Sequence, residues 1–226
     1  QMKSERMKTE LITNVSHDIK TPLTSIINYV DLLKKDHTPE EEKEYIDVLS
    51  RQSDRLKKLI DDLLEASKAS TGNINVDMKE FLSSEIIYQS SAEYSDRFKN
   101  ANLNVVISIP DEERKITADG RLLWRVLDNL FSNACKYAQS GTRVYVDLKQ
   151  TQTNTIISVK NISKDQLNIN ADELMERFVR GDASRNTEGS GLGLNIAKSL
   201  VELQGGKFNL EIDGDLFKAE IVLNNK

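Results

Sequence analysis

Several residue types that would mark a particular class of protein are scarce in this chain of 226 residues. Its single cysteine, Cys135, rules out an internal disulfide and is compatible with a reducing compartment. No apolar run approaches the roughly 20 residues of a membrane span, and we expect no signal peptide in this sequence. We therefore expect a cytoplasmic chain. Because Gln1 lies within a continuous helical pattern, we also expect a fragment, whose parent reaches the cell membrane only through missing N-terminal parts.

An excess of positive charge is lacking as well. Lys and Arg total 31 against 36 Asp and Glu, which gives a net charge of -5. A surface that follows a nucleic-acid backbone needs a basic excess or a clear basic patch, so general nucleic-acid binding is excluded. Any phosphate that this protein handles is therefore expected at one local site. With 38% hydrophobic and 30% charged residues, the chain is ordinary for one or two globular domains.

Histidine is rare, and one of the two histidines, His17, lies in an amphipathic helical pattern that reaches about residue 35. At about 100° per residue, His17 projects roughly 200° away from Val15 and Ile19, which belong to the apolar stripe. Most lone exposed histidines are solvated polar residues, so this helix alone leaves a reactive and an ordinary role open.

Two polar side chains lie beside His17 on the same helix. Asp18 follows it directly, and Thr21 shares its helical face four residues on. Pro22 has no amide hydrogen for the carbonyl of Asp18, which loosens the helix one turn beyond His17. A carboxylate, an imidazole and a hydroxyl are thus expected close together.

A second helix is predicted to start at a capping box, with Thr38 as N-cap, Pro39 at the first helical position and Glu41 three residues after the cap. Its apolar stripe would pair with that of the first helix in an antiparallel hairpin. Two amphipathic helices cannot cover both stripes, whereas two hairpins form a closed four-helix bundle. The sequence therefore predicts a homodimer.

The turn-prone residues 69–73 mark a predicted domain boundary, with one domain over residues 1–70 and another over residues 71–226. Beyond it, strand and helix patterns mix. We expect strands at 74–78, 102–109, 115–117, 143–149, 155–160, 207–212 and 217–223, and helices at 79–100, 120–138 and after 191. This order predicts an α+β sandwich with helices on one face of the sheet.

The expected helix 120–138 carries Asn129, Asn133 and Lys136 on one polar face, followed by Tyr137. An amide oxygen suits Mg²⁺, which prefers hard oxygen ligands and keeps phosphates and waters in its shell. Lys136 could meet a phosphate. Taken alone, these residues could also form an ordinary solvent-exposed polar face of a helix.

A glycine-rich turn, residues 189–194, opens the last expected helix. Glycines allow close approach of backbone amides, and a helix N-terminus favours an anion, so this turn could cradle phosphate. It lacks the Lys-Ser/Thr ending of a P-loop and the third glycine of a dinucleotide fingerprint. An ordinary helix-entry turn is the alternative. The polar segment before it, anchored by Phe178, is expected to be a mobile lid.

Together, the His-Asp-x-x-Thr-Pro helix, the Asn-x-x-x-Asn-x-x-Lys-Tyr helix and the Gly-x-Gly-x-Gly turn resemble the cytoplasmic core of a bacterial sensor histidine kinase, over essentially the whole chain. The resemblance implies a dimerisation and phosphoacceptor hairpin followed by an ATPase domain of the gyrase, Hsp90 and histidine kinase type. It implies ATP-dependent autophosphorylation, transfer to an aspartate of a response regulator, and dephosphorylation of that regulator. ATP and Mg²⁺ are the implied cofactors.

The resemblance also implies residue roles. His17 would be the phosphoacceptor, and Thr21 would orient water for the dephosphorylation. From the chemistry of the pair, we expect Asp18 to act as the base that holds or accepts a proton of the imidazole. Asn133 would be the Mg²⁺ ligand. The expected nucleotide contacts are Asn129, Asn133, Lys136, Tyr137, Asn161, Gly189, Gly191, Leu192 and Gly193, with Arg180 and Arg185 either near the γ-phosphate or only solvated.

One box departs from the family pattern. Where such kinases carry Asp-x-Gly-x-Gly after a strand, this chain has Asn161 in place of the adenine-binding Asp and Ser163 in place of a Gly. The Asn161 oxygen can still accept a hydrogen bond from the adenine amino group, but a neutral acceptor makes a weaker bond. We expect weaker nucleotide affinity. A strand-end Asn in a turn is the alternative.

Two other functions remain open from the sequence. A nucleotide-binding scaffold without phosphoryl transfer would account for the departure at Asn161. A plain ATPase of the gyrase or chaperone type would leave the exposed His17 motif without a use.

Overall fold

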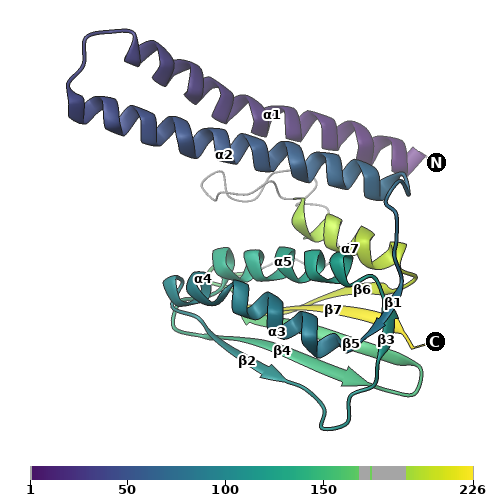
Figure 1. The fold of residues 1–226 in the computed structure, drawn as a ribbon. Coiled ribbons are helices and arrows are strands. Elements are labelled where there is room, and N and C mark those ends of the chain that lie inside the picture. Colours follow the sequence, from purple (N-terminus) through teal and green to yellow (C-terminus); the bar gives the residue numbers. More distant parts are fainter. Residues whose placement is uncertain (1, 168–173, 175–191, 226) are drawn as a thin grey trace. The chain divides into compact units, whose positions relative to one another are not determined.

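The computed structural model describes residues 2–167, 174 and 192–225 (Figure 1). The chain divides into two compact units, and the division after the first helices falls between Ser67 and Lys68. This lies close to the predicted domain boundary after residue 70, which stays a prediction. Within the described ranges, no helix has both the length and the apolar character needed to cross a membrane.

The first unit is built around a helical hairpin, α1 (Met2–Leu33) and α2 (Pro39–Ser70). The predicted capping box is present at the start of α2. The amide of Glu41 donates to Thr38 Oγ1 at 3.2 Å, and the amide of Thr38 donates to Glu41 Oε2 at 2.8 Å. The bond from the Thr38 amide to the Glu41 carboxylate lowers the pKa of that carboxyl. Near the connection, the rings of Tyr29 and Tyr45 pack edge to face at 5.6 Å.

The second unit contains a five-stranded mixed sheet in the order β2-β4-β5-β7-β6. Strand β2 pairs with β4 in parallel, and the other pairs are antiparallel. Strands β1 and β3 form a separate antiparallel pair. The elements are β1 (Lys79–Phe81), α3 (Ser83–Glu93), α4 (Ser95–Asn100), β2 (Asn104–Ser108), β3 (Ile116–Ala118), α5 (Gly120–Tyr137), β4 (Arg143–Gln150), β5 (Asn154–Ile162), α7 (Gly193–Leu203), β6 (Lys207–Asp213) and β7 (Leu216–Asn224).

Helices α3, α5 and α7 lie on one face of this sheet (Figure 1). Strand β4 illustrates the reason, because alternate side chains along it are buried: Val144, Val146 and Leu148 are at most 3% exposed. The opposite face carries ion pairs, among them Lys160 with Asp147 at 2.6 Å. The predicted α+β sandwich with helices on one sheet face is confirmed.

Two expected elements are wrong. Residues 74–78 form no strand, since β1 starts at Lys79 and pairs through Phe81 with Ile116 of β3. The expected helix 79–100 is instead β1 followed by two helices, which meet at Tyr94. Tyr94 is 4% exposed, and its hydroxyl donates to Asp128 of α5, so a tertiary contact places the break.

Candidate functional site

Helix α5 is the element on which the candidate site is built. Its N-terminus is capped by Asp119, whose side chain accepts from the amides of Arg121 and Leu122. Its apolar side is fully buried through Leu123, Val126 and Leu127, each 0% exposed. This burial fixes the rotation of the helix, so that its polar side chains fall together. The half-buried polar residues are Arg125, Asp128, Asn129, Asn133 and Lys136.

Asn129 meets the start of α7. A Cβ atom on Gly193 would lie 2.9 Å from Asn129 Oδ1, which is too close for any real side chain. The Asn129 amide group is itself held, since Nδ2 donates to the carbonyl oxygen of Arg125 at 3.0 Å. Two predicted site residues about 60 positions apart are therefore in direct contact. Leu192, just before α7, is 2% exposed.

The other end of α5 is joined to the end of β5. The amide of Gln139 donates to the carbonyl of Ile162 at 2.8 Å, and the amide of Lys164 donates to the carbonyl of Tyr137 at 2.8 Å. The structure thus brings Lys136 and Tyr137 to the strand end that carries Asn161. Asn161 pairs with Phe217 inside β5 and is 5% exposed, so it is not a turn residue. It falls on the side of β5 whose residues, Thr155, Ile157 and Val159, are buried.

Lys164 takes part in this junction although its sequence context gave no signal. Its ammonium group donates to the carbonyl oxygen of Lys136 at 2.8 Å and lies 5.9 Å from the centre of the Tyr137 ring. A cation at a helix C-terminus satisfies free carbonyls and interacts favourably with the helix dipole. Lys164 therefore holds the backbone that presents Lys136 and Tyr137.

Asp119 was also missed, although an Asp directly before Gly120 is a recognisable N-cap signal. It is 1% exposed, and its carboxylate forms an ion pair with Arg121 at 2.8 Å. Burial by itself would raise the pKa of Asp119. The hydrogen bonds from Arg121 and from three backbone amides outweigh burial and hold that pKa below its usual range.

A second network supports the middle of α5. The Tyr94 hydroxyl lies 2.5 Å from Asp128 Oδ1 and 3.0 Å from the Asp128 carbonyl oxygen. The other carboxylate oxygen of Asp128 bonds with the Arg125 guanidinium. Burial, and then the bond to Asp128, raise the pKa of the Tyr94 hydroxyl, which therefore stays a donor. This network holds the residue next to Asn129.

His17, Asp18 and Thr21 lie on α1, in the other unit. The backbone is helical throughout this stretch, so His17 and Thr21 are about one turn apart on one face. Asp18 is half-buried and Thr21 is exposed. The His17 side chain lies outside the described residues, as do Arg180, Arg185, Gly189, Gly191 and the expected lid with Phe178.

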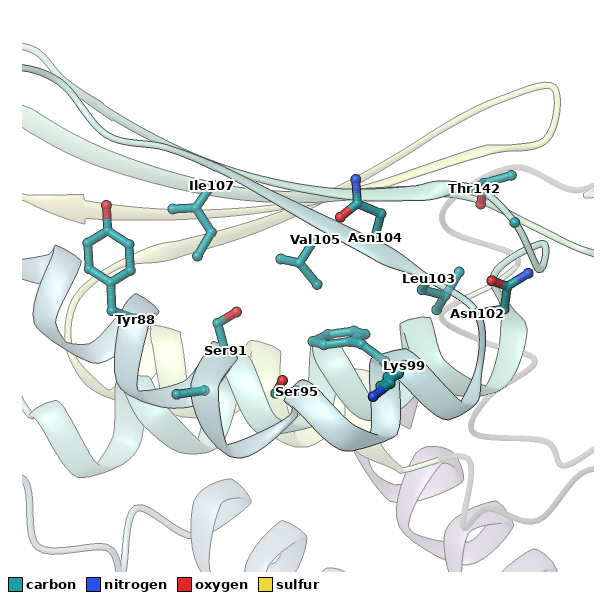
Figure 2. A pocket seen from close by; sticks show the side chains of 13 residues that line it. Tyr88, Ser91, Ser95, Lys99, Asn102, Leu103, Asn104, Val105, Ile107 and Thr142 are labelled. Atoms are coloured by element: carbon teal, nitrogen blue, oxygen red, sulfur yellow. The ribbon is translucent and has the colours of Figure 1, made fainter.

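A groove of about 630 Å³ lies elsewhere in the second unit, between helices α3 and α4 and the edge strand β2 (Figure 2). Figure 2 shows Tyr88 and Ile107 toward one end of it and Lys99, Asn102 and Thr142 toward the other. Of the predicted site residues that the structure describes, none lines this groove. It is therefore distinct from the candidate site on α5.

Two families match the chain. Residues 7–72 match the His Kinase A (phospho-acceptor) domain. Residues 118–223 match the histidine kinase-, DNA gyrase B-, and HSP90-like ATPase family. The first match contains α1 and α2 with His17, and the second contains α5, β5 and α7 with the candidate site.

Among solved structures, the histidine kinase AdeS of Acinetobacter baumannii is similar with a TM-score of 0.73 and 16% identity, over 93% of this chain and 98% of that one. A crystal structure of the histidine kinase ThkA in complex with the response regulator TrrA is similar with a TM-score of 0.77 and 22% identity, over 99% of this chain and 64% of that one. At such identities these likenesses show the fold.

Curated proteins are similar in sequence over nearly the whole chain. The sensor histidine kinase YcbM of Bacillus subtilis is 30% identical over 213 residues, which is 92% of this chain and 68% of YcbM. The histidine protein kinase SaeS of Staphylococcus aureus is 33% identical over 233 residues, or 96% of this chain and 63% of SaeS. The predicted resemblance is confirmed, and the chain belongs to the sensor histidine kinase family.

Proposed function

We propose that this chain transfers the γ-phosphoryl group of ATP to His17 and then passes it to an aspartate of a response regulator. The observation that carries the proposal is the contact between Asn129 of α5 and Gly193 at the start of α7. This contact brings α5, which carries Asn129 and Asn133, against the N-terminus of α7 within the region that matches the ATPase family. A helix N-terminus beside polar side chains suits the phosphates of a nucleotide. The histidine motif occupies the phosphoacceptor-family region of the same chain.

ATP binding follows from the ATPase family, and the contacts of the nucleotide are part of the proposal. The adenine amino group bonds with Asn161, and Lys136 and Tyr137 contact the nucleotide beside it. The phosphates lie along Gly189, Gly191, Leu192 and Gly193 at the N-terminus of α7, with Asn129 behind them. Arg180 and Arg185 approach the γ-phosphate.

Mg²⁺ is proposed as the companion of ATP, with Asn133 as its protein ligand. In the described part of the chain, no group of three or more His, Cys, Asp or Glu side chains could hold a metal ion. A half-buried amide on the same helix side as Asn129 fits an ion that takes few protein ligands and several phosphate oxygens and waters. When bound, the ion neutralises charge on the phosphates.

At His17, the reaction is a phosphoryl transfer in line with the leaving oxygen of ADP. One imidazole nitrogen forms the N–P bond while the bond from the γ-phosphorus to the bridging oxygen breaks. Asp18 holds or accepts the proton of the other nitrogen, so that the attacking nitrogen presents its lone pair. The product is a phosphoramidate on His17. Catalysis then depends mainly on positioning and charge neutralisation.

The phosphoramidate serves a receiver aspartate of a response regulator, and the ThkA structure shows that a kinase with this fold can form a complex with such a regulator. Thr21 is one turn from His17, and its hydroxyl is proposed to orient water when the regulator is dephosphorylated. The hairpin would work as a homodimer. Its exposed apolar residues include Leu23, Ile27 and Leu64, as expected of a stripe that a second hairpin covers.

The test is incubation with γ-labelled ATP followed by acid and base treatment. The chain should acquire a label that acid removes and base spares. His17→Gln should abolish it with unchanged nucleotide binding, and undiminished labelling would rule out His17 as acceptor. Thr21→Ala should keep the label and lose regulator dephosphorylation. Nucleotide binding without any label would favour a scaffold, and ATP hydrolysis without a label would favour a plain ATPase.

A further inference from the structure

Asp119 makes more bonds than a helix cap needs. Its carboxylate accepts from the Arg121 amide at 3.0 Å and the Leu122 amide at 3.3 Å, which caps α5. It also accepts from the amide of Asp77 at 2.8 Å and pairs with the Arg121 guanidinium at 2.8 Å. A serine or threonine would suffice for the cap alone. The additional bonds reach the segment that leads from α2 to β1.

We call residues 71–78, between α2 and β1, the connector. Its first residues bond back to α2, because the amides of Gly72 and Asn73 donate to the carbonyls of Ala69 and Lys68. Its later residues bond to the first turn of α5, because the Asn75 carbonyl accepts from Arg121 Nη2 at 3.3 Å and the Asp77 amide donates to Asp119. The bonding of the connector thus changes from one helix to the other within two residues.

Asp119 is also linked to the end of α7 through Gln204, the residue that follows this helix. The backbone amide of Asp119 donates to Gln204 Oε1 at 2.9 Å, and Gln204 Nε2 donates to the carbonyl of Leu200 near the end of α7. The connector, the start of α5 and the end of α7 therefore meet at one buried position. Farther along, α5 and α7 touch again where Asn129 meets Gly193. Asp119 and this contact hold the two helices at two separate points.

We propose that Asp119 is a positioning residue for phosphoryl transfer, which fixes the connector to the helix that carries the nucleotide-site asparagines. The inference rests on the proposed function. Nucleotide binding requires that α5 and α7 keep their relative position. The apolar core and the contact of Asn129 with Gly193 maintain that position even without Asp119. Phosphoryl transfer to His17 also needs a short, anchored connector between α2 and the ATPase unit. A loose connector would lower the fraction of time in which the γ-phosphate is in line with the attacking nitrogen of His17.

The experiment uses the full chain with Asp119→Ser. Serine keeps a cap on α5 but is too short to accept from the Asp77 amide as well. Loss of a hydrogen bond to a charged group corresponds to about a tenfold change in an equilibrium. We expect hydrogen exchange of the Asp77 amide to accelerate about tenfold and the rate of His17 labelling at saturating ATP to fall about tenfold. The Kd of a fluorescent ATP analogue should change less than about twofold.

Arg121→Ala is the second variant, because it removes the bond to Asn75 and the ion pair with Asp119 but leaves the Asp119 carboxylate to cap α5 and to accept from the Asp77 amide. Like Asp119→Ser, it should lower the rate of His17 labelling at saturating ATP and leave the Kd of the ATP analogue unchanged. Arg121→Lys should restore part of that rate. Lys79→Ala is the matched control. Lys79, the first residue of β1, pairs with the exposed side chain of Asp77 at 2.6 Å and forms no ion pair with α5 among the described residues, so all three readouts should stay as they are.

Three outcomes overturn the inference. The saturated rate of both variants could equal that of the parent chain, the Kd could weaken in proportion to the rate, or the Asp77 amide could exchange no faster in Asp119→Ser. Failure of the proposed function is separate, because the unsubstituted chain would then carry no acid-labile label at all.

Discussion

The side-chain oxygen of Asn129 occupies the space into which a Cβ of Gly193 would project, at 2.9 Å from the Cβ position. A side chain at this last glycine of the glycine-rich turn would therefore have to displace Asn129 or shift α7. Packing against Asn129 therefore limits the side chain at position 193 independently of nucleotide binding, because the clash would arise even when no nucleotide is bound.

Gly193→Ala should consequently disturb the site from within. The added methyl must displace Asn129 or move α7, and forcing an extra carbon into a packed contact costs about 1–3 kcal/mol. We expect a lower midpoint of urea unfolding and about tenfold weaker binding of an ATP analogue.

Gly120→Ala supplies the control for this prediction. A Cβ there would lie 3.5 Å from Ile86 Cδ1, an ordinary contact, at the first position of α5. Its unfolding midpoint and nucleotide affinity should match those of the parent. An equally stable Gly193→Ala with parental affinity would show that Asn129 moves aside freely.

Tyr94→Phe tests the network behind α5. The phenyl ring would keep its packing on Phe98 and Phe131, each with ring centres 5.7 Å away, so the change removes only the hydroxyl. Asp128 then loses one buried donor, which should cost about 1–2 kcal/mol of unfolding free energy. Urea denaturation measures this. Tyr88→Phe, at a side chain 55% exposed, should leave the free energy of unfolding unchanged, and equal stability of both variants would contradict the role given to Asp128.

The sequence predicts well those elements whose signals are local. The capping box of Thr38 and Glu41 and the helix from Gly120 were placed correctly, because caps and helical periodicity act over a few residues. Strand β1 and the helix break at Tyr94 were not, because they depend on partners far along the chain, Ile116 and Asp128.

The site shows the same limit. The spacing of Asn129, Asn133 and Lys136 predicts one helix face, and these residues do share the half-buried side of α5. The contact between Asn129 and Gly193 has no local signal, since it arises from the packing of α5 on α7. Lys164 is likewise found only through the fold, because β5 returns it to the end of α5.

Ile27→Lys tests the proposed homodimer. Ile27 is 53% exposed on α1 and belongs to a row with Leu23 and Val30. A lysine in the core of a four-helix bundle would bury a charge without a partner, so sedimentation should show a shift from dimer to monomer. Tyr145→Lys, on the outer face of the sheet, is the control and should sediment as the parent does. A parent chain that is already monomeric would argue against the two-fold bundle.

Asn161→Asp introduces the acidic residue expected from the resemblance at this position, and the nucleotide-free and ATP-bound states of the protein should respond in opposite directions. Without nucleotide, a carboxylate at a side chain 5% exposed lacks solvent, so we expect the free energy of unfolding to fall by about 1–3 kcal/mol. With ATP, a charged acceptor binds the adenine amino group more strongly than an amide, so the Kd should tighten severalfold. GTP, whose base has a carbonyl oxygen there, should gain nothing. Asn209→Asp on the exposed side of β6 carries the same change of charge. Because it lies opposite Glu220 it should lower the free energy of unfolding slightly, but it should leave both Kd values unchanged, which separates a local bond to adenine from a change in net charge. Equal tightening for ATP and GTP, or none for ATP, would mean that Asn161 does not contact the base.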